Sequence, residues 1–546
     1  FTSSATISIS SFVLSSDKVR RKEPWASSCF KPMANSTWEG SKDPEVHADP
    51  LEAQDRNLIF AQDATYSHQS NNQKKVYKYQ KWETYGYLDY VTYADYLNAL
   101  KAKGEIDEDT RSKAVAFGRT KDQDSELVSE YVKEFTAYYK AKGYTVRRYD
   151  AIMMGKKKYA NGGQQQLFAY KDIPLATRLG KYFSGLIDID SIHDAAKVEG
   201  KRGITFTLHD PVYGGKKFSP AIMGNGTTHK YLMYFDSKFP YFHQNIITIN
   251  LGKSYSVNEG VDVALTMTRA QGSYVKSEIT YPSGLVEYSA DDLHSATYMN
   301  ESQDASAVHS DRFADDYTNV DTVKSGKSKI GYSFVIGIIA VILSYLIAVP
   351  LGILMARKKD KLVDQLGTIY IVFIIAVPSL AYIFLFKAIG GKIGLPTTFD
   401  MDSKSKLMYI LPIVSLALPQ VANLMKWLRR YMIDQMNSDY VKFARSGGLT
   451  EGEIFTKHIL KNAAIPIVQG VPASVLFALT GAIITERVYV VPGAGNLLTE
   501  AISKYDNGVI VGVTLFYAVL SVISIILGDV LMSMVDPRIS FSTKDR

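Results

Sequence analysis

The dominant pattern in the chain is a set of long apolar runs, all in its C-terminal part. Each spans about 20 residues, the length an α-helix needs to cross a bilayer, and none carries a charged side chain. Prolines inside several runs leave backbone groups without their usual hydrogen bonds. Such prolines are tolerated in a membrane when neighbouring helices supply the missing hydrogen bonds, so they favour a packed bundle. The five runs are Phe334–Ala356, Gly367–Phe386, Leu407–Met425, Asn462–Thr485 and Gly508–Gly528. The pattern predicts an α-helical polytopic membrane protein.

The N-terminal half has shorter and more mixed patterns, which predict a separate α+β domain. Amphipathic helices are expected at Thr92–Lys103, with Thr92 as the cap, and at Ser125–Lys142. Further on, β-branched or aromatic runs between Gly, Pro and Asn residues predict strands. The expected strands are Gly203–Leu208, Lys230–Phe235, Asn245–Asn250, Val263–Thr268 and Tyr274–Tyr281. The polar segment Asp304–Lys329 is expected to link this domain to the first apolar run.

The average composition hides this division. The mean hydropathy of −0.06 resembles that of a soluble protein, yet it averages a polar half and an apolar half. The net charge of +7 comes entirely from residues 326–546, where basic residues flank the apolar runs, so it indicates a membrane and not nucleic acid. Cys29 is the only cysteine, which excludes a disulfide framework and a cysteine metal cluster within the chain.

Basic residues between the runs predict the orientation of the bundle. Lysines and arginines gather after the first, third and fifth runs, and the positive-inside rule places these regions in the cytoplasm. They include Arg357, Lys358, Lys359, Lys361, Lys426, Arg429, Arg430, Lys442, Arg445, Lys457, Lys461, Arg538, Lys544 and Arg546. Residues 1–329 are therefore expected outside the cell.

An exported N-terminal domain requires a signal peptide or a preceding membrane helix. Residues 1–60 contain neither, and the sequence begins with Phe1. We therefore expect that a sixth, N-terminal span is missing from the sequence, and that residues 1–55 are disordered or spurious.

Short motifs for catalysis or cofactor binding are weak. Ser325–Ser328 imitates the end of a phosphate-binding loop, but Asp321 stands where that loop needs its first glycine, so a polar linker fits better. Pro492–Gly495 lacks the third glycine of a dinucleotide loop and is expected to be a tight turn. The histidines show no metalloprotease spacing. We expect no catalytic residue, no cofactor and no metal site.

The most informative segment is the long loop between the third and fourth runs. Tyr440–Ser446 is expected to form a short helix, which the double glycine after it breaks; its apolar contacts are Val441, Phe443 and Ala444. Thr450 then caps a second helix, whose apolar face is formed by Ile454, Phe455, His458 and Ile459. A helix lying on lipid is one alternative. The paired acids at its start and the tight turn favour a protein partner.

This loop resembles the coupling loop of ABC importer permeases, in the variety found in dipeptide and oligopeptide transporters. Those permeases carry a pattern close to Ala-Arg-x-x-Gly-Leu-x-x-x-x-Ile-x-x-x-His-x-x-x-Asn-Ala-x-x-Pro. The positions that match in register are Ala444, Arg445, Gly448, Leu449, Ile454, His458, Asn462, Ala463 and Pro466. The chain departs from the wider permease pattern at Lys442, Phe443 and Gly447.

Other segments resemble the same family. Glu486–Gly495 and Val535–Ile539 are similar to later permease motifs. Gly226–Ser254 resembles the enlarged outer domain of oligopeptide permeases from Gram-positive cocci and lactobacilli. The resemblance thus covers both halves of the chain.

The resemblance implies a permease subunit of an ABC importer for oligopeptides, located in the cell membrane and not itself an enzyme. The implied partners are a second permease subunit, two ATP-binding subunits that hydrolyse ATP, an extracellular peptide-binding lipoprotein, a peptide substrate and the lipid bilayer, without nucleic acid. The residues expected to couple to the ATPase are Ala444, Arg445, Gly448, Leu449, Glu451, His458, Asn462 and Pro466.

The expected layout follows from these predictions. Residues 1–55 have no recognised structure, 56–303 form the extracellular α+β domain and 304–329 the linker. Residues 330–540 form the transmembrane permease domain, with a cytoplasmic coupling loop at 436–465, and 541–546 form a cytoplasmic tail.

Two other functions stay open at this point. A secondary, ion-coupled transporter would need paired polar residues at mid-membrane. Asp529 is the one acid deep in an apolar run, and the simpler interpretation places it near the cytoplasmic end, facing a basic partner. A membrane-anchored receptor with an extracellular sensor domain would need a cytoplasmic signalling domain, and only ten residues follow Asp536.

Overall fold

The computed structural model describes residues 50–118, 120–149, 166–210, 212, 215–235, 241–298, 311–320, 322–401, 403 and 405–536. The chain separates into two units, residues 1–55 and 56–546, and the contacts reported below lie within the second. The predictions for residues 1–49 and for the tail 541–546 fall outside the described residues, as does most of the Val535–Ile539 motif.

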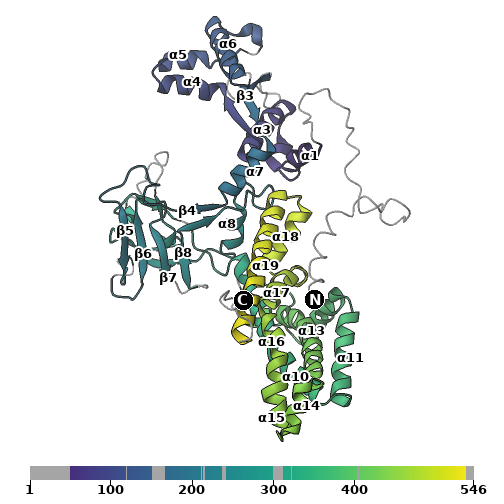
Figure 1. Ribbon diagram of the computed structural model, residues 1–546. Helices are drawn as coiled ribbons and strands as arrows, with labels where there is room; N and C mark the ends of the chain where they lie inside the picture. Colours follow the sequence, from purple (N-terminus) through teal and green to yellow (C-terminus); the bar gives the residue numbers. More distant parts are fainter. Residues whose placement is uncertain are drawn as a thin grey trace, which may run out of the picture. The chain divides into compact units, whose positions relative to one another are not determined.

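The first part of the outer half is a three-stranded antiparallel sheet with helices around it (Figure 1). The strand order is β1 (Leu88–Thr92), β3 (Gln166–Asp172), β2 (Thr145–Tyr149). The helices are α1 (Pro50–Leu58), α2 (Ala64–His68), α3 (Asn71–Thr84), α4 (Tyr93–Ala102), α5 (Glu108–Ala114), the short η1 (Lys121–Gln123) and α6 (Glu126–Ala141). Both predicted helices are confirmed, as α4 and α6, with Thr92 and Ser125 as their caps.

Tyrosines build much of this core, because their rings pack while their hydroxyls find acceptors. Tyr79, Tyr93, Phe135 and Phe168 are fully buried. The rings of Tyr93 and Phe135 meet edge to face at 5.6 Å, and the Tyr93 hydroxyl donates to the carbonyl of Ala114 at 3.1 Å. The tyrosine-rich composition of this half therefore has a packing role.

The second part of the outer half is built on a four-stranded antiparallel sheet. Its strand order is β5 (Gly203–Thr207), β6 (Ala221–Asn225), β7 (Tyr231–Phe235), β8 (Phe242–Gln244). Three antiparallel two-stranded ribbons accompany it. They are β4 (Ile187–Ile189) with β9 (Ile247–Ile249), β10 (Ser277–Thr280) with β11 (Val286–Ser289), and β12 (Thr297–Tyr298) with β13 (Tyr317–Asn319). The remaining elements are α7 (Leu175–Ser184), α8 (Val263–Thr268) and η4 (Leu293–Ser295).

Two expectations for this part need correction. Val263–Thr268 is not a strand but the helix α8, because the Asp262 side chain caps it by accepting from the backbone N–H of Ala264. Its buried residues Val263, Thr266 and Met267 follow helical spacing. The segment expected to be a linker is partly packed: β13 pairs with β12, and Phe313 and Tyr317 lie in the sheet's core.

The C-terminal half is an all-helical bundle (Figure 1). Its elements are α10 (Lys329–Arg357), α11 (Leu362–Ala376), α12 (Ser379–Lys392), η5 (Lys406–Tyr409), α13 (Ile410–Met436), α14 (Asp439–Ser446), α15 (Glu451–Glu453), the π-helix η6 (Ile454–Leu460), α16 (Lys461–Gln469), α17 (Val471–Tyr489), α18 (Ala494–Ser503) and α19 (Asn507–Val535).

Three helices in the described part of the chain are long and apolar enough to cross a membrane: Lys329–Arg357, Lys406–Met436 and Asn507–Val535. The predicted second run is a bent pair, α11 and α12, whose axes differ by 108°, so up to four spans result if that pair counts as one. Pro378 stands at this bend, where its ring cannot continue the first helix. The predicted fourth run is divided at Gly470 between α16 and α17.

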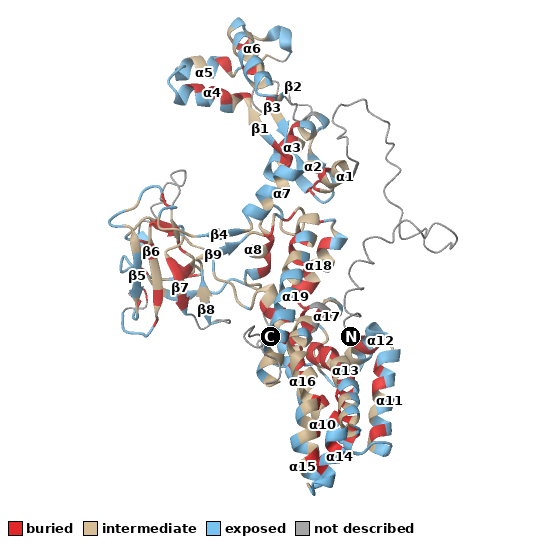
Figure 2. Cartoon of the chain, viewed as in Figure 1, coloured by how far each residue is buried: buried red, intermediate tan, exposed pale blue. Residues whose placement is uncertain are grey.

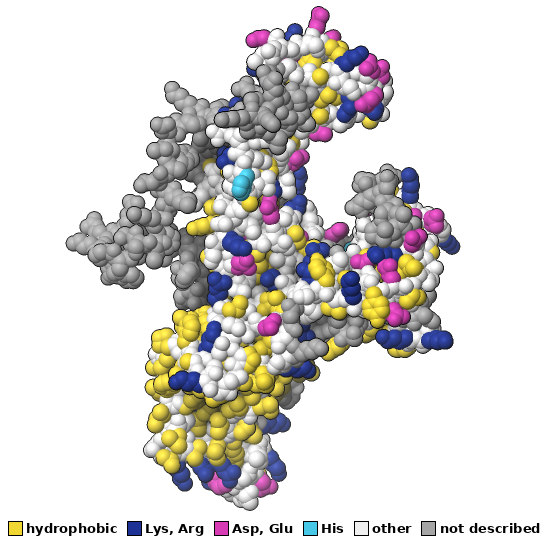
Figure 3. Space-filling model, turned by 180° about the vertical axis from the view of Figure 1, so that it is seen from behind, with side chains coloured by type: hydrophobic (Ala, Val, Ile, Leu, Met, Phe, Trp, Pro, Cys, Tyr) yellow, Lys and Arg dark blue, Asp and Glu magenta, His cyan; other side chains and the backbone are white. Residues whose placement is uncertain are grey.

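Helices α10 and α13 form the centre of the bundle. A Cβ on Gly352 would lie 3.1 Å from Leu428 Cδ2, so the absent side chain allows this close approach. The Ser344 hydroxyl donates to the carbonyl of Ala417 at 3.1 Å across the same contact. Much of α11 is exposed (Figure 2). Its outward-facing positions are apolar instead of polar, as at Ile369 and Val372, which are mostly exposed. Figure 3 shows hydrophobic side chains gathered on one face of the bundle, as expected of a surface in contact with lipid.

Candidate functional site

The loop between α13 and α16 begins with the short helix α14. Val441 is fully buried and Ala444 is nearly so, and both pack with Leu428 and Met432 of α13. Phe443 lies on the opposite side of the helix and is 82% exposed. The expectation that Phe443 contributes an apolar contact within the chain is wrong, because residues two positions apart on a helix face different sides.

A tight turn follows α14 and reverses the chain. Gly448 has φ +81°, a left-handed conformation that favours glycine. Its N–H donates to the carbonyl of Arg445 at 3.1 Å, and the N–H of Leu449 donates to the carbonyl of Ala444 at 3.3 Å. These bonds satisfy the last carbonyls of the helix, and Leu449 turns back against the apolar cluster under α14.

An ion pair bridges this turn. Arg445 Nε donates to Glu451 Oε1 at 2.5 Å and Arg445 Nη2 to Glu451 Oε2 at 3.1 Å. The Arg445 guanidinium holds the pKa of the Glu451 carboxyl below its usual range. Both side chains are exposed, so the pair fixes the orientation of the turn more than it stabilises the fold.

The second helix of the loop starts as the sequence predicts. Thr450 and Glu453 form a reciprocal capping box, in which each side chain accepts from the other's backbone N–H. The helix then widens into the π-helix η6, where Ile454 and Ile459 are buried against α13 and α14. π-Helical turns are rare in proteins, and those that occur are often found at functional sites.

The remaining predicted residues lie along η6 and α16. His458 is half-buried, with its ring 6.5 Å from that of Tyr440. Pro466 has no N–H to give to the carbonyl of Asn462, one turn earlier, which weakens the helix at that point. The structure therefore places Ala444, Arg445, Gly448, Leu449 and Glu451 together around the turn, and it places His458, Asn462 and Pro466 along the helix that leads into α17.

Sequence reasoning missed an ion pair between α11 and α13, of which the carboxylate is buried. Asp364 in the first turn of α11 is buried, and Arg429 of α13 donates to both of its carboxylate oxygens, at 2.5 and 2.7 Å. Bidentate pairs of this kind are strong and directional. Asp364 lies just N-terminal to the second apolar run, so the sequence alone gave it no visible partner.

Glu486, the first residue of a motif noted in the sequence, has a role that was not predicted: it fixes the connection between α17 and α18. It is fully buried and accepts from the hydroxyl of Ser333 at 2.6 Å and from the backbone N–H of Asn496 at 2.9 Å. A side chain on Gly493 would collide with this carboxylate. The predicted turn at Pro492–Gly495 is thus the entry to α18, which Gly493 caps.

A second missed acid, Asp506, joins the outer half to the bundle. It is completely buried and caps α19 through the backbone N–H of Val509 at 3.1 Å. It also accepts from the Ser254 hydroxyl at 2.6 Å and from the backbone N–H groups of residues 255–257, each at 2.9 Å. Burial opposes the charge on Asp506, but these bonds outweigh it and lower its pKa.

Packing around Asp506 is equally tight. Leu251, Val263 and Met267 of the outer half share a buried cluster with Leu497 and Val513 of the bundle. A Cβ on Gly512 would lie 2.8 Å from the carbonyl oxygen of Leu251. This contact of residues 251–268 with α18 and α19 is the outer junction.

Other candidate chemistry is limited. Within the residues that the structure describes, no group of three His, Cys, Asp or Glu side chains is placed to hold a metal ion. Within the described residues, Asp529 on α19 accepts from the amide of Gln469 at 3.5 Å.

Comparisons with known proteins place these features in a family. Residues 348–541 match the family model described as "Binding-protein-dependent transport system inner membrane component". The chain is 33% identical over 496 residues to the oligopeptide transport system permease protein AmiC of Streptococcus pneumoniae, a match that covers 90% of this chain and 93% of AmiC.

Two other matches are shorter. The chain is 30% identical over 224 residues to the dipeptide transport system permease protein DppB of Lactococcus lactis subsp. cremoris, covering 41% of this chain and 73% of DppB. A solved structure titled "Crystal structure of an amino acid ABC transporter with histidines" aligns with a TM-score of 0.30 at 16% identity, covering 39% of this chain and 92% of that chain. Because the match to AmiC covers nine-tenths of both chains, the chain belongs to the family of binding-protein-dependent transport permeases, the membrane subunits of ABC importers.

Proposed function

We propose that this permease imports oligopeptides, as one of two permease subunits that together form the path across the membrane. The observation that carries the substrate class is the match to an oligopeptide permease over 90% of the chain, which includes the outer half as well as the bundle. In this proposal two ATP-binding subunits drive transport, and an extracellular peptide-binding lipoprotein delivers the substrate.

The loop at 436–465 is the proposed contact with the ATPase. It presents an exposed aromatic side chain, Phe443, next to the exposed ion pair of Arg445 and Glu451. Val441, Ile454 and Ile459 anchor its inner side on α13. A short helix with one exposed apolar anchor fits a groove on a partner, and buried aromatic side chains commonly dominate such interfaces.

The path of the motion follows from the same contacts. Movement of an ATPase would displace the turn at Gly448, and the packed base of the loop would pass the displacement to α13 and to α16. The transporter would have two conformations, and ATP would bind one of them more tightly. This difference in affinity is what couples ATP binding to the motion. His458, Asn462 and Pro466 lie along the helix that would bend.

We propose that the loop at 436–465 and the tail face the cytoplasm, and that the α+β domain at 56–303 faces outward as a docking platform for the binding protein. Support comes from the basic residues Arg357, Lys358 and Lys359 at the end of α10, on the side expected to be cytoplasmic. Residues 330–540 are the proposed permease domain.

The function is tested with Gly448→Pro. Proline cannot adopt φ +81° and has no N–H for the bond to Arg445, so the turn must rearrange. The variant is expressed in cells that lack the native gene, and uptake of a labelled oligopeptide is measured. We expect uptake to fall at least tenfold, which corresponds to a coupling free energy between the ATPase and the bundle weakened by about 1.4 kcal/mol. The amount of protein in the membrane is measured alongside.

A matched control lies four residues further on. Gly452 is in the first turn of α15, with open space where a side chain would be. Proline is tolerated in a first turn because its N–H is not needed there, so Gly452→Pro is expected to keep uptake. Normal uptake by Gly448→Pro would contradict the proposed role of the loop, and absence of peptide uptake by the wild-type chain with its partners would contradict the proposed function.

A further inference from the structure

The ribbon formed by β4 and β9 leaves its apolar residues uncovered. Ile187 pairs with Ile249, and Ile189 with Ile247, so the four isoleucines lie on one face of the ribbon. All four are exposed, between 48% and 63%. An apolar strand face is normally covered by other parts of the protein, and an exposed one often marks an interaction site.

The hydrogen bonds of the ribbon show which of its backbone groups point away from the paired strand. Asp190 N donates to Ile246 O at 2.8 Å, and Asn250 N to Leu186 O at 2.9 Å. Bonded positions alternate along an antiparallel pair, so the backbone groups of Ile247 and Ile249 point away from β4. They lie along the outer edge of β9.

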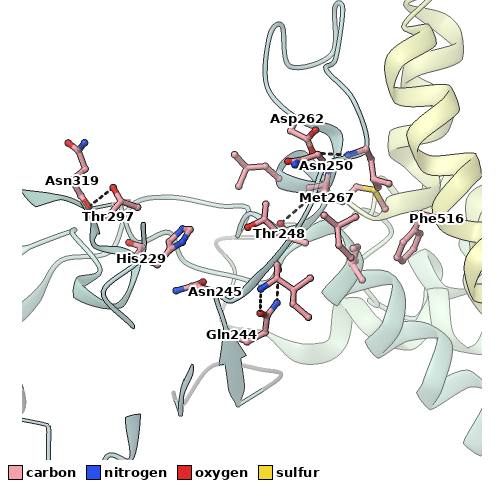
Figure 4. Close-up of a pocket in the computed structure, with 18 of the residues that line it drawn as sticks. His229, Gln244, Asn245, Thr248, Asn250, Asp262, Met267, Thr297, Asn319 and Phe516 are labelled. Atoms are coloured by element: carbon pink, nitrogen blue, oxygen red, sulfur yellow. Dashed lines mark hydrogen bonds between the residues drawn. The ribbon is translucent and has the colours of Figure 1, made fainter. Parts of the chain in front are cut away.

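The Gln244 side chain occupies part of this edge. Its Nε2 donates to the carbonyl of Ile247 at 2.9 Å, and its Oε1 accepts from the Ile247 N–H at 2.8 Å (Figure 4). An amide side chain that makes both bonds copies the peptide group of a neighbouring strand. Ile249 presents the same donor and acceptor one step further along.

A cavity of about 820 Å³ opens along this edge (Figure 4). It is within the size range of ligand sites in proteins, roughly 300–1,000 Å³. Ile247, Thr248 and Ile249 line one side, and the apolar side chains of Leu265, Met267 and Phe516 line another. The cavity therefore joins a strand edge to apolar side-chain pockets.

We propose that a peptide in extended conformation binds here by adding a strand to the outer edge of β9, displacing Gln244. Main-chain hydrogen bonds to Ile247 and Ile249 would supply sequence-independent affinity, and the side-chain pockets near Met267 and Phe516 would prefer apolar residues. The inference rests on the proposed function, because it takes the transported peptide as the occupant. It adds a site on the permease itself, at the outer junction.

The site is tested with a matched pair of proline variants. Ile249→Pro removes the N–H on the outer edge of β9, whereas Ile187→Pro removes the N–H of its cross-strand neighbour, which points away on the opposite edge. Proline is accepted at such edge positions. The probe is a fluorescent hexapeptide of alternating serine and valine, added to the complete transporter in nanodiscs without the binding protein. We expect Ile249→Pro to weaken binding at least tenfold and Ile187→Pro to leave it unchanged.

Two further measurements sharpen the test. Gln244→Ala removes the competing amide, so probe binding is expected to tighten about threefold to tenfold, the range for one or two hydrogen bonds. Because only every second amide of an added strand faces its neighbour, N-methylation of one alternate set of probe amides should abolish binding. Methylation of the other set should not.

The outcomes that overturn the site are specific. Wild-type binding by Ile249→Pro, equal loss in both proline variants, or equal effects of the two methylated probes would each exclude strand addition. Loss of binding-protein affinity in Ile249→Pro, without probe binding to the wild type, would assign the edge to the binding protein instead. In either case peptide uptake by the wild-type transporter would leave the proposed function standing.

Discussion

Asp506 shows at the scale of one residue how a buried charge is made tolerable. An isolated carboxylate in a protein interior loses its hydration, and the loss is offset only by several directed donors. Here one hydroxyl and four backbone N–H groups converge on the two oxygens. The carboxylate therefore holds together, through hydrogen bonds, two parts of the chain that are far apart in sequence.

Replacing this acid by its amide isolates the contribution of the charge. Asp506→Asn keeps the size of the side chain but turns an N–H₂ group toward backbone donors. Hydrogen bonds to charged groups contribute about 1.5–3 kcal/mol each, so we expect the outer junction to lose about 3 kcal/mol. Thermal unfolding and limited proteolysis of the transporter in nanodiscs measure the loss. Asp188→Asn, at an exposed position on β4, is the control and should change neither.

The same contact predicts a dependence on pH. Hydrogen bonds hold the pKa of Asp506 below its usual value, so its stabilisation is complete above the unfolded pKa and is lost as the pH falls through the folded one. Wild-type protein should lose stability at the junction below about pH 4. Asp506→Asn should show a smaller change in that range; an equal change would show that other groups titrate there.

At this scale the sequence predicts contacts between residues a few positions apart, but it does not predict contacts between distant parts of the chain. The caps Thr92 and Thr450 were predicted because their hydrogen-bond partners lie three residues away. The role of Asp506 was not, because its partners at Ser254–Val257 lie about 250 positions earlier in the chain. Phe443 was misplaced because apolarity alone does not decide which side of a short helix is buried.

At the scale of elements, the helix from Thr450 to Tyr489 is interrupted three times. It contains the π-helix η6, then Pro466, then the break at Gly470 between α16 and α17. Each interruption removes or redirects regular hydrogen bonds. The segment that joins the proposed ATPase contact to the bundle is therefore easier to bend than a continuous helix.

Pro466→Ala tests whether this weakness is needed. Alanine restores an N–H for the carbonyl of Asn462 and is favoured over proline in a helix by up to about 3 kcal/mol. We expect a higher melting temperature together with reduced peptide uptake. Pro472→Ala is the matched control, since Pro472 stands in the first turn of α17 where proline does little harm. Full uptake by Pro466→Ala would show that bending at this point is not required.

Periodicity identified most elements but not their interruptions. The apolar runs located α10, α13 and α19, yet the run at Gly367–Phe386 is two helices at 108°, because a proline in an apolar run permits either a kink or a complete break. The helix α8 was read as a strand, since its β-branched residues fit both periods over six positions. Tertiary packing at the outer junction decided that case.

At the scale of the whole molecule, the α+β domain and the loop at 436–465 are proposed to face opposite sides of the membrane. The single native cysteine makes this testable: Cys29→Ser gives a background to which one cysteine is added. Tyr288→Cys lies on the exposed surface of β11, and Lys457→Cys is exposed on η6. A membrane-impermeant maleimide should label the first on intact cells and the second only after the cells are opened. The reverse pattern would invert the orientation.

The outer junction also has a consequence for the order in which the protein is made. Ser254 and Asp506 are separated by 252 residues, and ribosomes add about 5–20 residues per second. The donors of the Ser254 turn are therefore synthesised roughly 10–50 seconds before their acceptor exists. During that interval α18 and α19 are absent, so Leu251, Val263 and Met267 lack the packing that Leu497 and Val513 give them in the folded protein. The packing of the outer half is therefore completed only after the last helix of the chain has been synthesised. A ribosome that stalls before Asp506 leaves that surface accessible to chaperones and proteases.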